Sequence, residues 1–171
     1  MARIVAADAD MGFAAWRRRA VPVITTIMAS LIDLLPFIAS RPLVPDFAFL
    51  TLIAWRLLRP EIWTAQMALP LGLANDLIAG HPIGQSMALW TLTLLLFDLA
   101  DSRVGYRDFW MDWLFAAAAV LGYAAGGWWI GMAMGSRMSF LVLGPQILLS
   151  LLAYPLVARL ILRLDRWRLS R

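Results

Sequence analysis

Residues 110–134 read WMDWLFAAAAVLGYAAGGWWIGMAM, and they decide the class of the fold. This stretch is long enough to cross the hydrocarbon core of a bilayer as a helix, and Asp112 is the one charged residue within it. Hydropathy predicts five further segments of this kind, at about 20–40, 43–58, 62–79, 83–100 and 140–162. With about 20 residues in each, the six segments take up roughly 70% of the chain and leave no stretch for a soluble catalytic domain.

The composition is that of an integral membrane protein. Hydrophobic residues make up 62% of the 171 residues and charged residues 15%, against roughly 45–50% and about 25% in soluble domains. A soluble fold of this size would need far more polar surface. The net charge of +4 does not indicate nucleic-acid binding, because the arginines stand at the ends of apolar segments. We therefore predict an all-α membrane protein with six transmembrane helices in one bundle.

The arginines also predict the orientation of this bundle. The second segment is doubtful by itself, since its most apolar part, Phe47 to Ala54, is short and contains Thr51. Counting it as a span places 13 of the 15 arginines on the cytoplasmic side and leaves Arg41 and Arg137 outside, as the positive-inside rule requires. Both termini then lie in the cytoplasm. The predicted parts are a cytoplasmic tail at 1–19, a membrane domain at 20–162 and a basic cytoplasmic tail at 163–171.

Carboxylates inside the predicted spans are the first functional candidates, because ionisable groups in a bilayer normally face protein or water. These carboxylates are Asp33, Asp46 and Asp76. Asp76 is flanked at four-residue spacing by Gly72 and Gly80, so the three share one helix face suited to tight packing around a polar anchor. Three interpretations of Asp76 stay open: a cap or bond to a neighbouring helix or loop, a docking point for a partner, or proton or substrate handling.

Small residues recur in the fifth segment as well, at Gly127, Gly131 and Gly135, with Gly122 and Gly126 on an adjacent stripe. This spacing permits the close approach of another helix, either a span of the same chain or one of a partner. Near the C-terminus, one helix face carries Arg159, Arg163 and Arg166, which are expected to bind anionic lipid headgroups. The connection from Asp98 to Asp112 mixes Asp and Arg and is predicted to be a solvated loop with local ion pairs.

Patterns typical of enzymes are missing from the sequence. His81 is the one histidine, there is no Cys, and neither GxSxG nor HExxH occurs. We predict no catalytic residues, no bound metal and no cofactor. A transport pocket should present polar groups converging at mid-membrane, whereas here residues such as Asp33, Gln85 and Gln146 are scattered over several spans.

Two stretches resemble the MreD family of rod shape-determining membrane proteins. The first comprises Arg41-Pro42, Pro45-Asp46-Phe47, Trp55-Arg56 and Arg59-Pro60-Glu61. The second is residues 72–84, GLANDLIAGHPIG, which resembles the family's Gly-x-x-x-Asp-Leu-x-x-Gly-x-Pro-Leu-Gly signature, with Ile83 in place of the usual Leu. The sharp part of the resemblance is confined to about 41–84, and beyond it the likeness is one of hydropathy.

The resemblance implies a non-enzymatic scaffold in the bacterial inner membrane that maintains cell shape. Such a subunit binds MreC and helps to couple cytoplasmic MreB filaments to RodA and a class B penicillin-binding protein, which make peptidoglycan. The residues expected to bind the partner or to anchor the structure are Asp76, Gly72, Gly80, Pro82, Gly84, Asp46 and Arg41. On this view the face formed by Gly72, Asp76 and Gly80 seats the MreC transmembrane region.

The family is also similar in fold to the substrate-capturing S-components of vitamin transporters. This similarity implies an alternative function, a small-molecule-binding or transport subunit. The small-residue faces favour the scaffold, whereas a closed central cavity would favour the binding subunit.

Overall fold

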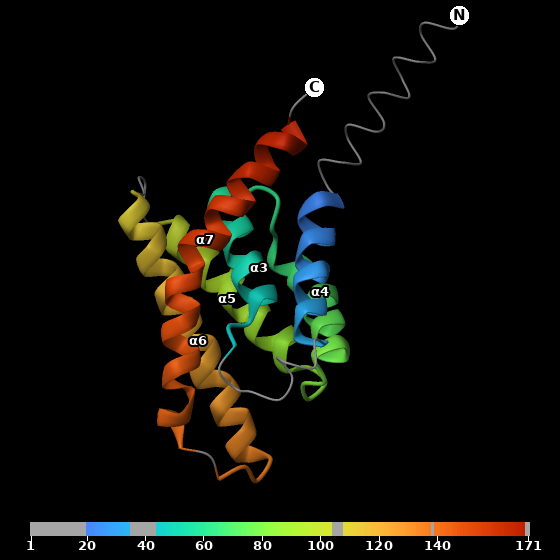
Figure 1. Cartoon of the computed structure of the whole chain (residues 1–171), viewed down its shortest axis with the longest axis vertical. Coiled ribbons are helices and arrows are strands. Elements are labelled where there is room, and N and C mark those ends of the chain that lie inside the picture. The colour runs from blue at the N-terminus through green and yellow to red at the C-terminus, as the bar shows by residue number, and fades with distance from the viewer. Residues whose placement is uncertain (1–19, 35–43, 104–107, 138, 170–171) are drawn as a thin grey trace, which may run out of the picture.

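The structure, a computed structural model, describes residues 20–34, 44–103, 108–137 and 139–169, and the regular elements in these ranges are all helical (Figure 1). The first helix of the described residues, Ala20–Leu34, ends in a 3-10 turn, η1, at Leu31–Leu34. The later elements are α3 (Phe47–Leu58), α4 (Ala65–Ala79), α5 (Gln85–Asp101), α6 (Phe109–Ala133), η2 (Phe140–Leu143) and α7 (Gly144–Leu169). The prediction of an all-α fold is confirmed.

The segment that was doubtful by itself, because its most apolar part is short, forms the innermost helix. Every residue of α3 from Ala48 to Leu57 is buried, and α3 packs against α6 and α7. Its 12 residues rise only about 18 Å at 1.5 Å per residue, less than the roughly 30 Å of a hydrocarbon core. Because protein and not lipid surrounds α3, it needs neither the length nor the unbroken apolar run of a lipid-facing span.

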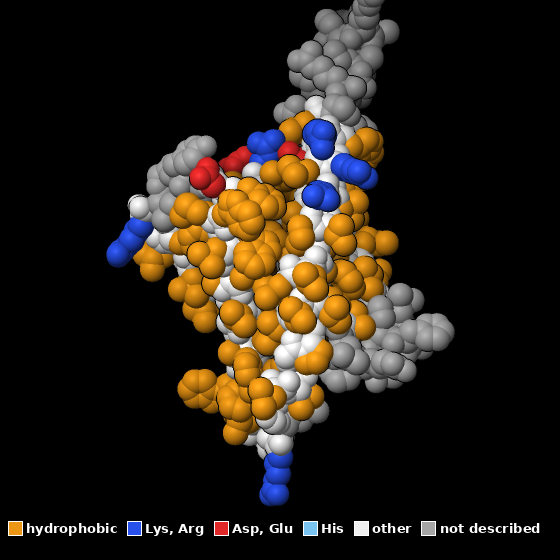
Figure 2. All heavy atoms as spheres, turned by 60° about the vertical axis from the view of Figure 1, so that its left-hand side comes forward, with side chains coloured by type: hydrophobic (Ala, Val, Ile, Leu, Met, Phe, Trp, Pro, Cys, Tyr) orange, Lys and Arg blue, Asp and Glu red, His pale blue; other side chains and the backbone are white. Residues whose placement is uncertain are grey.

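The surface is apolar between two polar ends. Both α6 and the continuous element Phe140–Leu169 are long and apolar enough to cross a membrane. Their exposed residues include Leu114, Leu121, Leu148, Leu152 and Leu156. In Figure 2 apolar side chains cover most of the visible face, with basic side chains gathered toward one end and a single one at the other. Contiguous apolar surface of this extent is rare on soluble monomers and suits contact with lipid.

The helix bundle has two opposite ends, which carry different parts of the chain. The first described helix starts and α7 ends at the same end of the molecule, which we call the terminal end (Figure 1). The opposite end, which we call the turn end, carries the start of α3, the α4–α5 turn at residues 80–84 and the end of α6 (Figure 1). At the terminal end α7 continues to Leu169, so most of the segment predicted as a basic tail is helical.

Candidate functional site

The turn between α4 and α5 is built around Asp76. Its Oδ2 accepts the backbone N–H of Gly84 and its Oδ1 that of Ser86, each at 2.8 Å. The backbone reverses through Gly80 and Gly84, whose φ values of +71° and +98° are readily adopted by glycine. Asp76 is 1% exposed. It therefore acts as a buried anchor that satisfies amide groups at the start of α5.

Gly72 allows α4 and α5 to touch. A Cβ atom on Gly72 would lie 2.5 Å from the Cα of Met87 and 2.6 Å from its backbone nitrogen, so only glycine fits this contact. One turn further along α4, the buried Asn75 donates its Nδ2–H to the Ser86 hydroxyl oxygen at 3.0 Å. The two helices thus form a closely packed hairpin.

The predicted small-residue face is consequently used inside the chain. Gly72 and Asp76 are covered by α5, which supports the interpretation of Asp76 as a cap for a neighbouring element and leaves neither residue free to seat a partner directly. Pro82 belongs to the same turn, where its carbonyl accepts the Gln85 N–H at 3.0 Å. The outward side of α4 is instead apolar, with Leu69, Leu73 and Leu77 exposed by 43%, 38% and 67%.

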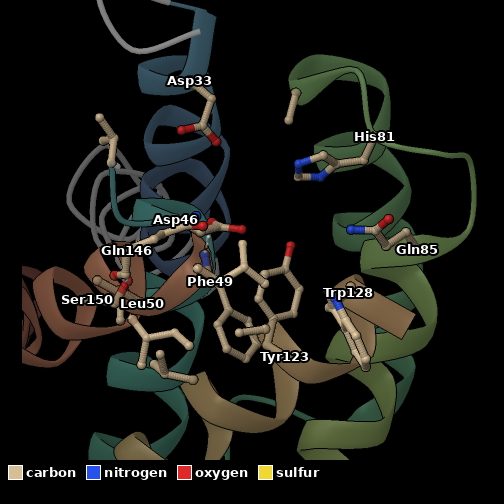
Figure 3. A pocket seen from close by; sticks show the side chains of 17 residues that line it. Asp33, Asp46, Phe49, Leu50, His81, Gln85, Tyr123, Trp128, Gln146 and Ser150 are labelled. Carbon is tan, nitrogen blue, oxygen red and sulfur yellow. Dashed lines mark hydrogen bonds between the residues drawn. The ribbon is translucent and has the colours of Figure 1, made fainter. Parts of the chain in front are cut away.

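A cavity of about 370 Å³ lies at the turn end (Figure 3). Asp33 and Asp46 stand on one side of it, His81 and Gln85 on the other, and the Tyr123 hydroxyl points into the space between them (Figure 3). Asp46 also caps α3, because its Oδ1 accepts the Phe49 N–H at 2.8 Å. Arg41, which the sequence grouped with Asp46, lies outside the described residues.

The cavity corrects one expectation from the sequence. The polar residues of the spans were expected to be scattered, but Asp33, Gln85 and Gln146 line the same space, together with His81 and Ser150. A partial signal was available, because His81 and Gln85 lie beside a predicted segment boundary at the turn end, whereas Asp33, Gln146 and Ser150 lie further inside their segments. Hydropathy treats each segment separately and so does not reveal that these ends converge.

Arginines at the terminal end are held by carboxylates from other helices. Arg56, whose side chain is 2% exposed, donates through Nη2 to Asp98 at 2.7 Å and to Asp101 at 2.8 Å. These two aspartates were predicted to lie in a solvated loop with local partners. Both belong to α5 and reach across to α3, and Arg56 itself, a charge inside an apolar helix, was the signal for this pairing.

A second cluster at this end centres on Asp165 of α7. Its Oδ2 accepts hydrogen bonds from Arg59 Nε at 3.1 Å and Nη2 at 2.9 Å, and its Oδ1 accepts one from Arg168 at 2.6 Å. The hydrogen bond to Asp165 raises the pKa of Arg59 above its ordinary value. The Arg168 guanidinium lies over the Trp55 ring at 5.2 Å, and the Trp55 Nε1–H donates to Thr25 at 2.9 Å. The cluster ties the first helix, α3 and α7 together.

The predicted glycine stripe of α6 is a packing surface only in part. A Cβ on Gly127 would lie 3.4 Å from the Gln85 side chain of α5, whereas one on Gly131 would meet only Ser136 of the following turn, at 3.7 Å. Gly135 lies beyond α6 with φ +92°, a turn conformation. Among the glycines of α6, Gly126 is packed most tightly against α5, since a Cβ there would overlap the end of the Leu89 side chain.

The predicted lipid-binding arginines project from the last turns of α7. Arg159, Arg163 and Arg166 are all exposed. Arg166 donates its Nε–H to the carbonyl of Leu162 at 3.3 Å. Their exposure beside an apolar surface is compatible with headgroup contact, which stays a prediction.

Comparison with known proteins identifies the family. The family model described as rod shape-determining protein MreD matches residues 17–164, which extends the likeness well beyond the motifs at 41–84 and confirms the resemblance. No curated protein and no solved structure matches the chain, so the similarity to transporter S-components stays a prediction. With the match spanning nearly all of the apolar helices, this chain belongs to the MreD family of rod shape-determining membrane proteins.

Proposed function

We propose that the chain is a non-enzymatic scaffold of the cell-elongation complex in the bacterial inner membrane. The family match over residues 17–164 carries this proposal, because it covers the helices and leaves only short ends outside. In this role the chain binds MreC and, through it, helps to couple MreB filaments to RodA and a class B penicillin-binding protein during peptidoglycan synthesis. The broad apolar surface supports a function carried out within the membrane.

In the proposed topology six spans place the terminal end in the cytoplasm and the turn end outside. The distribution of arginine supports this orientation, because Arg56, Arg59, Arg168 and the exposed arginines of α7 are all at the terminal end. The described turn end contributes Arg137 alone to the basic residues. Such an asymmetry is what the positive-inside rule requires.

The surface proposed to contact MreC is the outward side of α4. Leu69, Leu73 and Leu77 form an exposed apolar row at four-residue spacing, which ends beside the turn where Ile83 is 78% exposed. Asp76 and Gly72 hold this hairpin in shape from behind, so they support the contact without touching the partner. A partner with one span and an external domain would pass this turn as it leaves the membrane.

The experiment is co-purification of MreC with the tagged chain in mild detergent. Leu73→Trp and Leu77→Trp enlarge the row without adding charge, and we expect each to reduce MreC recovery by about tenfold, because bulky side chains block close helix approach. Leu156→Trp, at a residue of α7 that is 66% exposed, is the matched control and should leave recovery unchanged. Absence of MreC with the wild-type chain would contradict the scaffold role itself, and full recovery with both α4 variants would contradict the choice of surface.

A further inference from the structure

We propose that the cavity at the turn end is a binding site for a substituted ammonium group, carried by a small polar amine or by a lipid headgroup. This function goes beyond the scaffold role and does not depend on it. The cavity is formed by the first helix and by α3 to α7, so the site exists only when the whole bundle is assembled.

Charge is the first argument for a cation. Asp33 and Asp46 share one wall of the cavity, and none of the described lining residues is an arginine (Figure 3). Asp46 uses one oxygen to cap α3, and no described basic side chain pairs with either carboxylate. Partly buried carboxylates favour an opposite charge close by. A ligand ammonium on this wall would supply it.

The aromatic lining is the second argument. Tyr123 stacks on Phe49 with ring centroids 4.2 Å apart, which fixes its ring and directs its hydroxyl into the cavity (Figure 3). Trp128 lines the same space from one turn further along α6. Tyr and Trp are the side chains whose rings attract ammonium groups most strongly.

The opposite wall defines the rest of the ligand. His81 and Gln85 face the carboxylates across the cavity, and Gln146 and Ser150 add further hydrogen-bonding groups from α7 (Figure 3). The His81 Nδ1 lies 3.4 Å from the Ser86 hydroxyl, which ties the ring to the α4–α5 hairpin. A molecule with an ammonium at one end and a hydroxyl or phosphate at the other would satisfy both walls. The volume of about 370 Å³ falls in the range of small-molecule sites.

An ammonium of this kind can come from a free amine or from a phosphatidylethanolamine headgroup, and the test separates the two sources. In the first arm, saturation-transfer NMR follows ethanolammonium binding to the purified full-length chain, with ethylene glycol as the neutral analogue. In the second arm, native mass spectrometry of the chain from nanodiscs measures retained phosphatidylethanolamine against phosphatidylglycerol. The variants are Asp33→Asn and Asp46→Asn, and the latter keeps the cap because Asn also caps helices.

We expect saturable binding in at least one arm, weakened by about tenfold or more in both variants, because each loses a charged hydrogen bond. Glu61→Gln, which removes the same charge from an exposed carboxylate at the terminal end, should leave binding unchanged. Binding of ethanolammonium supports a free amine, and selective retention of phosphatidylethanolamine alone supports the headgroup. Absence of binding in both arms would overturn the proposal. So would equal binding by the wild-type chain and by a variant that is folded, as judged by its elution volume and Tm.

Discussion

The two ends of the bundle differ in whether their carboxylates are paired with basic side chains of the protein. At the terminal end Arg56 of α3 lies between Asp98 and Asp101 of α5. Asp165 of α7 binds Arg59, which follows α3, and Arg168 of its own helix, so opposite charges meet at 2.6–3.1 Å. At the turn end the carboxylates of Asp33 and Asp46 face a cavity without a described basic partner. Charges that meet each other hold helices together, whereas charges that face open space are available to a ligand.

Asp76 shows that position alone does not decide the role of a carboxylate. It lies at the turn end, near the cavity, yet backbone amides occupy both of its oxygens. It therefore behaves like the paired charges of the terminal end. The useful distinction is between carboxylates whose partners belong to the chain and those whose partners must come from elsewhere.

The largest loss of stability is expected for Asp165→Asn. The Asp165 side chain is 6% exposed and neutralises Arg168, which is 4% exposed, so its loss leaves buried positive charge without this carboxylate. We expect destabilisation by about 3–5 kcal/mol, measured as a lower Tm of the purified chain in detergent. Glu61→Gln is the control, since Glu61 is 64% exposed and lies 3.7 Å from Arg59, and it should stay within about 1 kcal/mol of wild type. An equal change in Tm for the two variants would contradict the stabilising role proposed for the Asp165 ion pairs.

An intermediate loss is expected for Asp76→Ala. Two amide groups at the start of α5 lose their acceptor, and we expect about 2–3 kcal/mol of destabilisation. Asp108→Ala is the control, because Asp108 is the N-cap residue of α6 but its side chain makes no cap hydrogen bond there. Thermal unfolding of both variants should separate them clearly. A Tm of Asp76→Ala equal to that of Asp108→Ala would mean that Asp76 does not anchor the hairpin.

The smallest effect is expected for Asp33→Asn. No described partner is lost and a partly buried charge is removed, so stability should change by no more than about 0.5 kcal/mol or should rise. The measurement is the same thermal unfolding without added amine. A loss as large as that of Asp165→Asn would show that Asp33 is held by the protein, and the contrast between the two ends would disappear.

Much of this fold could be predicted from the sequence, because each helix is indicated by its own stretch of apolar residues. Apolar runs predicted the helical class. The distribution of arginine was the reason to count the segment around Phe47–Ala54 as a helix of the bundle, and this segment forms the central helix α3. The anchoring role of Asp76 was among the predicted alternatives, since glycine at four-residue spacing indicates a close helix contact.

The sequence could not predict which residues that are far apart in the chain come into contact. Arg56 and Asp98 are 42 positions apart, and nothing in local hydropathy pairs them. The cavity depends in the same way on Asp33, Gln85 and Gln146 arriving at one place from three helices. The α6 glycine that contacts α5 is Gly126 and not Gly131. Which glycine makes the contact depends on how α6 is rotated about its axis, and the spacing of glycines alone does not determine that rotation.

In the proposed topology the two ends of the bundle lie on opposite sides of the membrane, with the cavity and the α4–α5 turn outside. Because the chain has no cysteine, single cysteines can report on it directly. Ile83→Cys marks the turn end, at a residue 78% exposed, and Glu61→Cys marks the terminal end. A membrane-impermeant maleimide applied to intact spheroplasts should label Ile83→Cys and should reach Glu61→Cys only after the membrane is opened. Labelling of Glu61→Cys in intact spheroplasts, or protection of Ile83→Cys until lysis, would contradict this topology.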